Sequence, residues 1–131
     1  MSQQTYTLTV TVDADPAEAE QRIRAALQEQ GFGILSEIDV EGALREKLGE
    51  EIGAYKILGA CNPPLAKRAV EADPDIGALL PCNVLLRANP DGGTDVAAAD
   101  PQAMLSLGAA GLEEVASEAR QRIRTALDSL S

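Results

Sequence analysis

The feature that most constrains the fold is a strict alternation of polar and apolar residues, rich in β-branched side chains, over residues 5–12. A period of two is typical of a β-strand with one buried face. The residues on that face are Tyr6, Leu8, Val10 and Val12. We therefore expect the chain to begin with a strand whose apolar side lies in the core of a sheet-containing domain.

The rest of the chain alternates helical and extended patterns. A helix is predicted from about Pro16 to Gln30, because Asp15 is a good N-cap, proline suits the first helical position and Gly31 provides a stop. Its predicted buried residues are Ala19, Ile23, Ala26 and Leu27. Turn signals then delimit strands at 32–38, 54–60, 83–88 and 94–99, helices at 43–48 and 65–73, an apolar turn at 76–80, and a helical tail from residue 101 that breaks near Gly108 and Gly111. This order predicts an α+β domain with a mainly antiparallel sheet of about five strands and helices packed on one face.

One stretch of the first helix returns near the C-terminus. Residues 18–27 and 118–127 share Glu-Ala at the start, Gln-Arg-Ile-Arg in the middle and Ala-Leu at the end. Two helices that lie side by side on one sheet need the same small and branched residues inward, with arginines outward. We interpret the likeness as convergence rather than duplication, and predict that both helices cover the same face.

Length and charge exclude several classes of protein. The 131 residues, with no break in composition, fit one domain spanning 1–131. A net charge of −10 opposes contact with phosphate backbones, so no nucleic acid is expected as a partner. The start of the chain lacks a basic, apolar leader, and no run of 18 apolar residues occurs. We expect an acidic cytoplasmic protein with no membrane insertion.

Two Cys-Asn dipeptides carry the only cysteines of a chain that has no histidine. The candidate site residues are Cys61, Asn62, Pro63, Pro81, Cys82 and Asn83. A helix that starts at the first motif can favour the thiolate of its cysteine, and Asn62 can cap that helix. If the strands at 54–60 and 83–88 are neighbours, the two motifs face each other. The alternative is ordinary burial, because cysteine often packs as a small hydrophobic residue.

The residues available favour neither a metal nor a catalytic set. Two thiols without histidine leave a structural zinc ion short of ligands, so we predict no metal and no cofactor. The carboxylate pairs Glu50-Glu51 and Glu113-Glu114 are interpreted as solvated surface. No nucleophile, base and acid can be assembled around histidine, which favours a protein that is not an enzyme. A disulfide between the two cysteines requires Cα atoms within about 7 Å.

Four ordered motifs between Tyr55 and Met104 resemble the domain-of-unknown-function 302 family. They are Gly59-Ala60-Cys61-Asn62-Pro63, Ala72-Asp73-Pro74-Asp75-Ile76-Gly77, Leu79-Leu80-Pro81-Cys82-Asn83-Val84 and Asp100-Pro101-Gln102-Ala103-Met104. With the flanking elements the resemblance covers nearly the whole chain. It implies a compact α+β domain similar to the TATA-binding-protein-like architecture, in a homodimer, and it carries no established reaction. Similar proteins are associated with sulfur-handling or membrane-associated functions, and this resemblance gives some weight to sulfur transfer.

Three functions follow from this reading. The leading hypothesis is a non-enzymatic, dimeric module that binds a small molecule or a protein partner in a cleft near Cys61 and Cys82. The alternative is a thiol-dependent sulfur-transfer or redox protein, in which Cys61 attacks and Cys82 resolves. The third is structural assembly through the C-terminal helix, with Leu127 and Leu130 in the interface.

Overall fold

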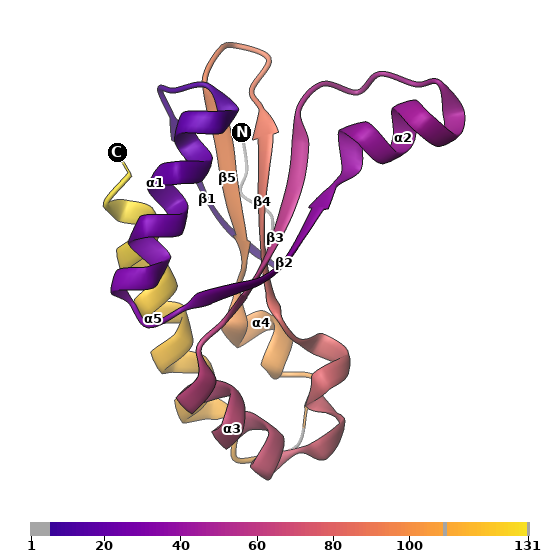
Figure 1. Ribbon diagram of the computed structural model, residues 1–131. Coiled ribbons are helices and arrows are strands. Elements are labelled where there is room, and N and C mark those ends of the chain that lie inside the picture. Colours follow the sequence, from indigo (N-terminus) through magenta and orange to yellow (C-terminus); the bar gives the residue numbers. More distant parts are fainter. Residues whose placement is uncertain (1–5, 109, 131) are drawn as a thin grey trace.

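The computed structural model describes residues 6–108 and 110–130. In this part of the chain five strands form one antiparallel sheet with the order β1-β5-β4-β3-β2. The strands are β1 (Thr7–Val12), β2 (Gly33–Asp39), β3 (Tyr55–Cys61), β4 (Cys82–Ala88) and β5 (Thr94–Ala99). The helices are α1 (Pro16–Glu29), α2 (Val40–Leu48), α3 (Pro63–Ala72), the 3-10 helix η1 (Pro74–Leu79), α4 (Pro101–Leu105) and α5 (Glu113–Asp128) (Figure 1). The predicted α+β class is confirmed.

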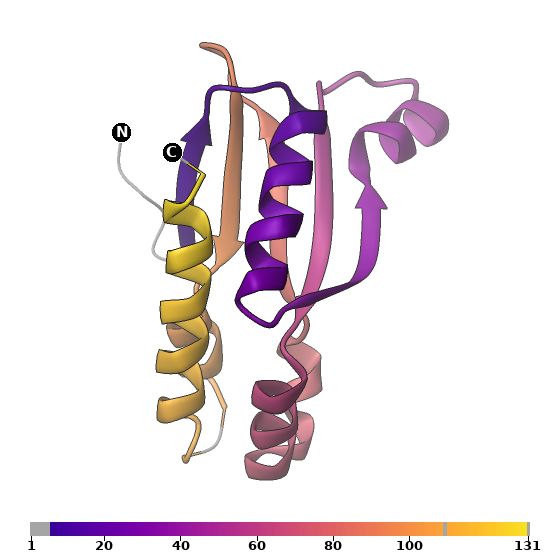
Figure 2. The same cartoon turned by 60° about the vertical axis from the view of Figure 1, so that its left-hand side comes forward.

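The two longest helices, α1 and α5, lie side by side along one face of the sheet (Figure 2). The predicted start of α1 is confirmed, because the Asp15 side chain accepts a hydrogen bond of 2.8 Å from the Glu18 amide. The main core forms between these helices and the sheet, and its fully buried side chains include Leu8, Ile23, Leu58, Ile123 and Leu127. The two helices that share the repeated sequence therefore pack in one layer on the same face of the sheet, as expected.

The alternation in β1 is confirmed for three of its four apolar residues. Leu8 and Val12 are buried, and Val10 packs against the same core. The expectation for Tyr6 is wrong: this side chain is 52% exposed because it precedes the first paired residue, Thr7.

A second, smaller core lies beyond the end of the sheet, where α3, η1, α4 and the start of α5 meet (Figure 1). Its buried residues include Leu65, Ala69, Ile76, Leu105, Leu112 and Val115. The sequence pattern also predicts Val70 and Leu107 on the apolar stripes of these helices, but both side chains are exposed, Val70 on α3 and Leu107 after α4. Leu107 lies outside the helix, so helical spacing does not place it on the packed face.

Helix α2 stands apart from the other helices and continues directly from the edge strand β2 (Figure 1). None of its residues is buried. Large apolar side chains on and beside it are exposed, among them Ile38, Leu48 and Ile52. Among the residues described, no helix has the length and apolar character needed to cross a membrane.

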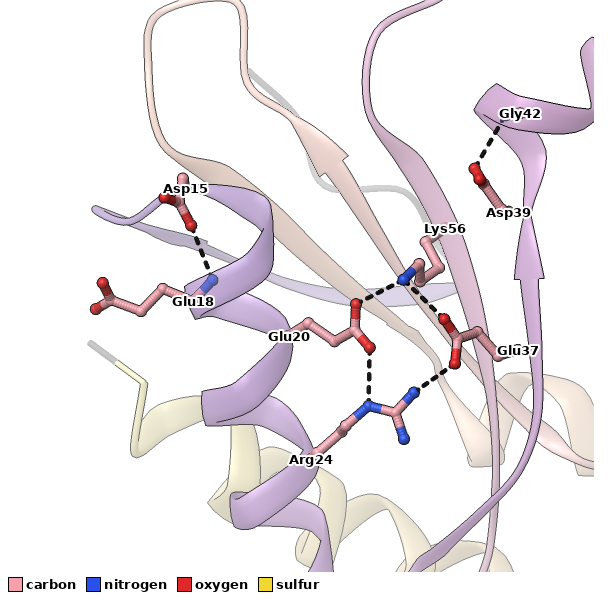
Figure 3. A network of polar contacts seen from close by, with 8 residues as sticks. All are labelled: Asp15, Glu18, Glu20, Arg24, Glu37, Asp39, Gly42 and Lys56. Atoms are coloured by element: carbon pink, nitrogen blue, oxygen red, sulfur yellow. Dashed lines mark hydrogen bonds and ion pairs between the residues drawn. The ribbon is translucent and has the colours of Figure 1, made fainter. Parts of the chain in front are cut away.

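A network of four charged side chains joins α1 to strands β2 and β3 (Figure 3). Lys56 donates to Glu20 at 2.9 Å and pairs with Glu37 at 2.7 Å, while Arg24 pairs with both carboxylates at 2.9 Å. Burial alone raises the pKa of Glu20, but the hydrogen bonds and charges of Lys56 and Arg24 outweigh it and lower this pKa. The network fixes the edge strand β2 to the helical layer.

Candidate functional site

The two Cys-Asn motifs meet at one end of the sheet. Cys61 is the last residue of β3 and Cys82 is the first residue of β4. These strands pair antiparallel, and the register sets Cys82 opposite Ala60, one residue from Cys61. The condition under which the motifs were expected to face each other, neighbouring strands, is therefore met.

A cavity of about 280 Å³ opens at this junction. It lies between the end of the sheet and the helices of the second core. The sequence-predicted residues that line it are Cys61, Asn62, Pro81 and Cys82. Its other walls come from Phe32 just before β2 and Leu35 on β2, Leu65, Ala66 and Ala69 on α3, Leu79 and Leu80 before β4, Met104 and Leu105 on α4, and Val115 and Ala119 on α5, together with Ala60, Ala99 and Pro101.

The lining is apolar and carries no formal charge from a carboxylate, amine or guanidinium group. Among the described residues at the cavity, Asn62 is the only one with an amide side chain. Its polar atoms already have partners within the protein. The two cysteine thiols are the side chains at the cavity that are left to make a polar contact with a ligand.

Asn62 holds the helix that forms one wall of the cavity. It is the N-cap of α3, and its buried side chain accepts from the Leu65 amide at 3.4 Å. Its Nδ2 donates to the backbone carbonyl of Gln30 at 3.3 Å. That carbonyl also accepts from Arg122 on α5 at 3.3 Å. Asn62 therefore caps α3 and also connects it to the end of α1. Because Arg122 donates to the same Gln30 carbonyl, α5 is connected at this point as well.

The second motif depends on a glycine in the strand beside it. A Cβ on Gly59 would lie 2.9 Å from Cγ of Pro81 and would collide with the Ser36 side chain. The absence of a side chain therefore allows Pro81, which follows a cis Leu80–Pro81 peptide bond, to lie close against β3. Gly59 belongs to the first sequence motif, but only the strand register of the structure shows that its missing side chain makes room for Pro81.

The thiols at the cavity are free and half-buried. Burial, together with the nearby Cys61, raises the pKa of Cys82 to about 11. This thiol is therefore neutral at neutral pH. Adjacent residues of a strand point to opposite faces, so the register that sets Ala60 opposite Cys82 does not by itself bring the sulfurs into disulfide geometry.

Two of the six candidate residues do not line the cavity. Pro63 is exposed at the first position of α3, where a missing N–H costs nothing. Asn83 is exposed on β4, opposite Gly59. No group of three or more Cys, Asp or Glu residues in the described ranges is arranged to hold a metal ion.

Sequence reasoning assigned four of the lining residues to the site and missed the others, among them Phe32 and Met104. Phe32 is the only phenylalanine of the chain, and it is buried beside the start of β2. Met104 lies in the last of the four sequence motifs but was not assigned to the site. Their rarity in the composition was a visible signal, but only the tertiary structure shows that they reach the cavity of the cysteines.

Comparisons with known proteins agree with this architecture. The family model "Domain of unknown function DUF302" matches residues 8–130. The chain is also similar to the crystal structure of the uncharacterized conserved protein DUF302 from Bacillus stearothermophilus, with a TM-score of 0.89 and 27% sequence identity. That match covers 98% of this chain and 100% of the other. The comparison with curated proteins gave no match. The family match over nearly the whole length shows that this chain belongs to the DUF302 family of domains of unknown function.

Proposed function

We propose that this protein is a non-enzymatic binding module whose cavity at the two Cys-Asn motifs takes up a small apolar molecule or an apolar side chain of a partner. One observation supports this most directly: four of the six candidate residues line one apolar cavity of about 280 Å³. A cavity of about 150 Å³ with a similar apolar lining accommodates benzene. The present volume suits a ligand of roughly two fused rings.

The walls of the cavity come from separate elements that are fixed by caps and packing. Asn62 caps α3, and the Asp100 side chain accepts from the Gln102 amide at the start of α4. A cavity with fixed walls needs little rearrangement to bind, which lowers the entropic cost of binding. Burial of apolar ligand surface against this lining provides the favourable free energy of binding.

The proposal is tested by filling the cavity from α3. Ala66 lines the cavity and is half-buried, so Ala66→Leu places a larger side chain in it. Ala72→Leu makes the same change on the same helix at an exposed residue outside the cavity and serves as the control. Isothermal titration with naphthalen-2-ylmethanol is expected to show binding to the wild type and the control, and at least tenfold weaker binding to Ala66→Leu. Equal affinities in all three proteins, or no binding to the wild type, would contradict the proposal.

A second candidate function is thiol-dependent sulfur transfer or redox chemistry, with Cys61 attacking and Cys82 resolving. It is favoured by one observation, that both thiols line the same cavity. The raised pKa of Cys82 argues against this thiol as the attacking group, because a neutral thiol is a poor nucleophile, and supports giving that role to Cys61. Iodoacetamide labelling of Cys61→Ser and Cys82→Ser across pH tests it. The hypothesis requires fast labelling of Cys61 near pH 7, and slow labelling of both thiols at that pH would eliminate it.

We further propose that the protein is a cytoplasmic homodimer, joined through the surface formed by β2 and α2. The strand β2 is at the edge of the sheet, so its outer backbone groups are free to pair with the same strand of a second copy. Apolar residues Ile38, Leu48 and Ile52 are exposed on this surface. Its charges have both signs, so a twofold partner can bring acidic groups of one copy to basic groups of the other.

The oligomeric state provides the test of this surface. Leu48→Asp lies on it, whereas Leu107→Asp introduces the same change at another exposed leucine near the opposite end of the fold. Light scattering after size exclusion is expected to give a dimer for the wild type and the Leu107 variant, and a monomer for the Leu48 variant. A monomeric wild type would overturn the proposal. For assembly through the C-terminal helix, Leu127 and Leu130 are not available as interface residues, because both are buried in the protein's own core.

A further inference from the structure

The cavity concentrates side chains that are rare in this chain. The sequence has two cysteines, two methionines and one phenylalanine. Both cysteines, Met104 and Phe32 line the cavity. Three sulfur atoms and the single phenyl ring of the chain therefore surround one space, while the cores elsewhere are filled mainly by Ala, Leu, Ile and Val.

Sulfur and phenyl groups differ from aliphatic side chains in one relevant property, their polarisability. A sulfur atom near the edge of an aromatic ring contributes attraction beyond that of buried area, and two rings in offset or edge-to-face contact do the same. An aliphatic ligand of equal shape gains the buried area but not these contacts. The lining thus distinguishes between two molecules that the hydrophobic effect alone treats as similar.

Charge restricts the ligand further. No Asp, Glu, Lys or Arg is found among the described residues that line the cavity. An ionised group placed inside would lose its hydration without gaining a counter-charge. The net charge of −10 adds repulsion for an anion approaching from solvent.

From these observations we infer that the cavity is selective for a neutral aromatic ligand, held between the sulfur atoms of Cys61, Cys82 and Met104 and the ring of Phe32. This inference rests on the proposed binding function and specifies the chemical class of its ligand. The ligand occupies the space between β3, β4, α3 and α4, and its ring faces the sulfur atoms. No covalent step is involved.

Three probes of matched skeleton separate aromaticity, charge and binding itself. They are naphthalen-2-ylmethanol, its fully saturated decahydro analogue, and naphthalene-2-carboxylate. Titration of the wild-type protein is expected to show the aromatic alcohol binding about threefold or more tighter than the saturated alcohol, and at least tenfold tighter than the carboxylate. The saturated alcohol exposes no less apolar surface, so buried area alone predicts no such preference for the aromatic ring.

A variant assigns the preference to sulfur. Met104→Leu removes one sulfur atom and nearly conserves volume, so the cavity stays formed. We expect this variant to bind the aromatic alcohol about twofold or more weaker than the wild type does, with the affinity for the saturated alcohol unchanged. Leu79→Ile, which changes the shape of another lining residue without touching a sulfur, controls for repacking.

The outcomes separate this inference from the proposed function. Equal or tighter binding of the saturated alcohol, or equal binding of the carboxylate, overturns the selectivity while binding itself stands. A preference for the aromatic alcohol that survives Met104→Leu unchanged overturns the role of the Met104 sulfur. Failure of all three probes to bind the wild type overturns both the selectivity and the proposed binding function.

Discussion

Replacement of Asn62 is expected to destabilise the protein by about 2 kcal/mol. In the structure its side chain caps α3 through the Leu65 amide and donates to the Gln30 carbonyl from a buried position. Loss of an N-cap costs about 1 kcal/mol, and loss of one buried hydrogen bond costs about 1 kcal/mol. Urea denaturation of Asn62→Ala at pH 7 should therefore show the unfolding midpoint fall with an unchanged slope.

Two further replacements separate the cap from the donor. Asn62→Ser keeps a capping oxygen but cannot reach Gln30 as a donor, so about half of the loss is expected. Asn62→Asp keeps the cap but sets a carboxylate oxygen beside the Gln30 carbonyl, so it should cost more than Asn62→Ser at pH 7. Protonation of that carboxyl at low pH restores a donor and should narrow the difference in the free energy of unfolding between the two variants. A change of less than about 0.5 kcal/mol for Asn62→Ala would refute the reasoning, because neither contact would then matter.

Three other changes test packing and charge. Glu20→Gln should lower the free energy of unfolding by less than about 1 kcal/mol at pH 7. The pKa of Glu20 is lowered in the folded protein, so its contribution to the free energy of unfolding is present above the ordinary carboxylate pKa. That contribution is lost as the pH falls through the lowered pKa. Urea denaturation below this pH should no longer distinguish the variant from the wild type. Gly59→Ala forces a methyl group against the Ser36 and Pro81 side chains, and chemical denaturation should show a loss of about 1–3 kcal/mol, whereas an unchanged midpoint would mean that these two side chains move aside freely. Leu127→Ala removes a fully buried side chain and should cost about 2–5 kcal/mol without changing the mass seen in light scattering.

The elements of the fold were predictable because local signals agree with the tertiary structure. The start of α1 has Asp15 as its N-cap and Pro16 at its first position, and the Thr94–Ala99 strand has the predicted bounds. Both are fixed by residues close in sequence, namely a capping side chain in one case and a glycine turn in the other. The failures are single apolar residues that the pattern placed on a packed face but that are exposed: Tyr6 and Leu107 just outside an element, and Val70 within α3.

The candidate site could be predicted only in part. The paired motifs identified Cys61 and Cys82 as candidates, on the condition that the two predicted strands are neighbours, and the pairing of β3 with β4 meets that condition. The cavity itself depends on the register of β3 with β4, on the room left by Gly59 for Pro81, and on the distance between α3 and α4. Those are properties of the packed chain. No local pattern connects Phe32 with Met104, which are separated by most of the sequence.

The most direct test of the account is a crystal structure of the protein with naphthalen-2-ylmethanol. The account predicts that the ring occupies the cavity between the Cys61–Cys82 corner of the sheet and Leu65 of α3, with Phe32 and Met104 in contact. A ring bound elsewhere, or a space at this corner closed by the surrounding side chains, would contradict it.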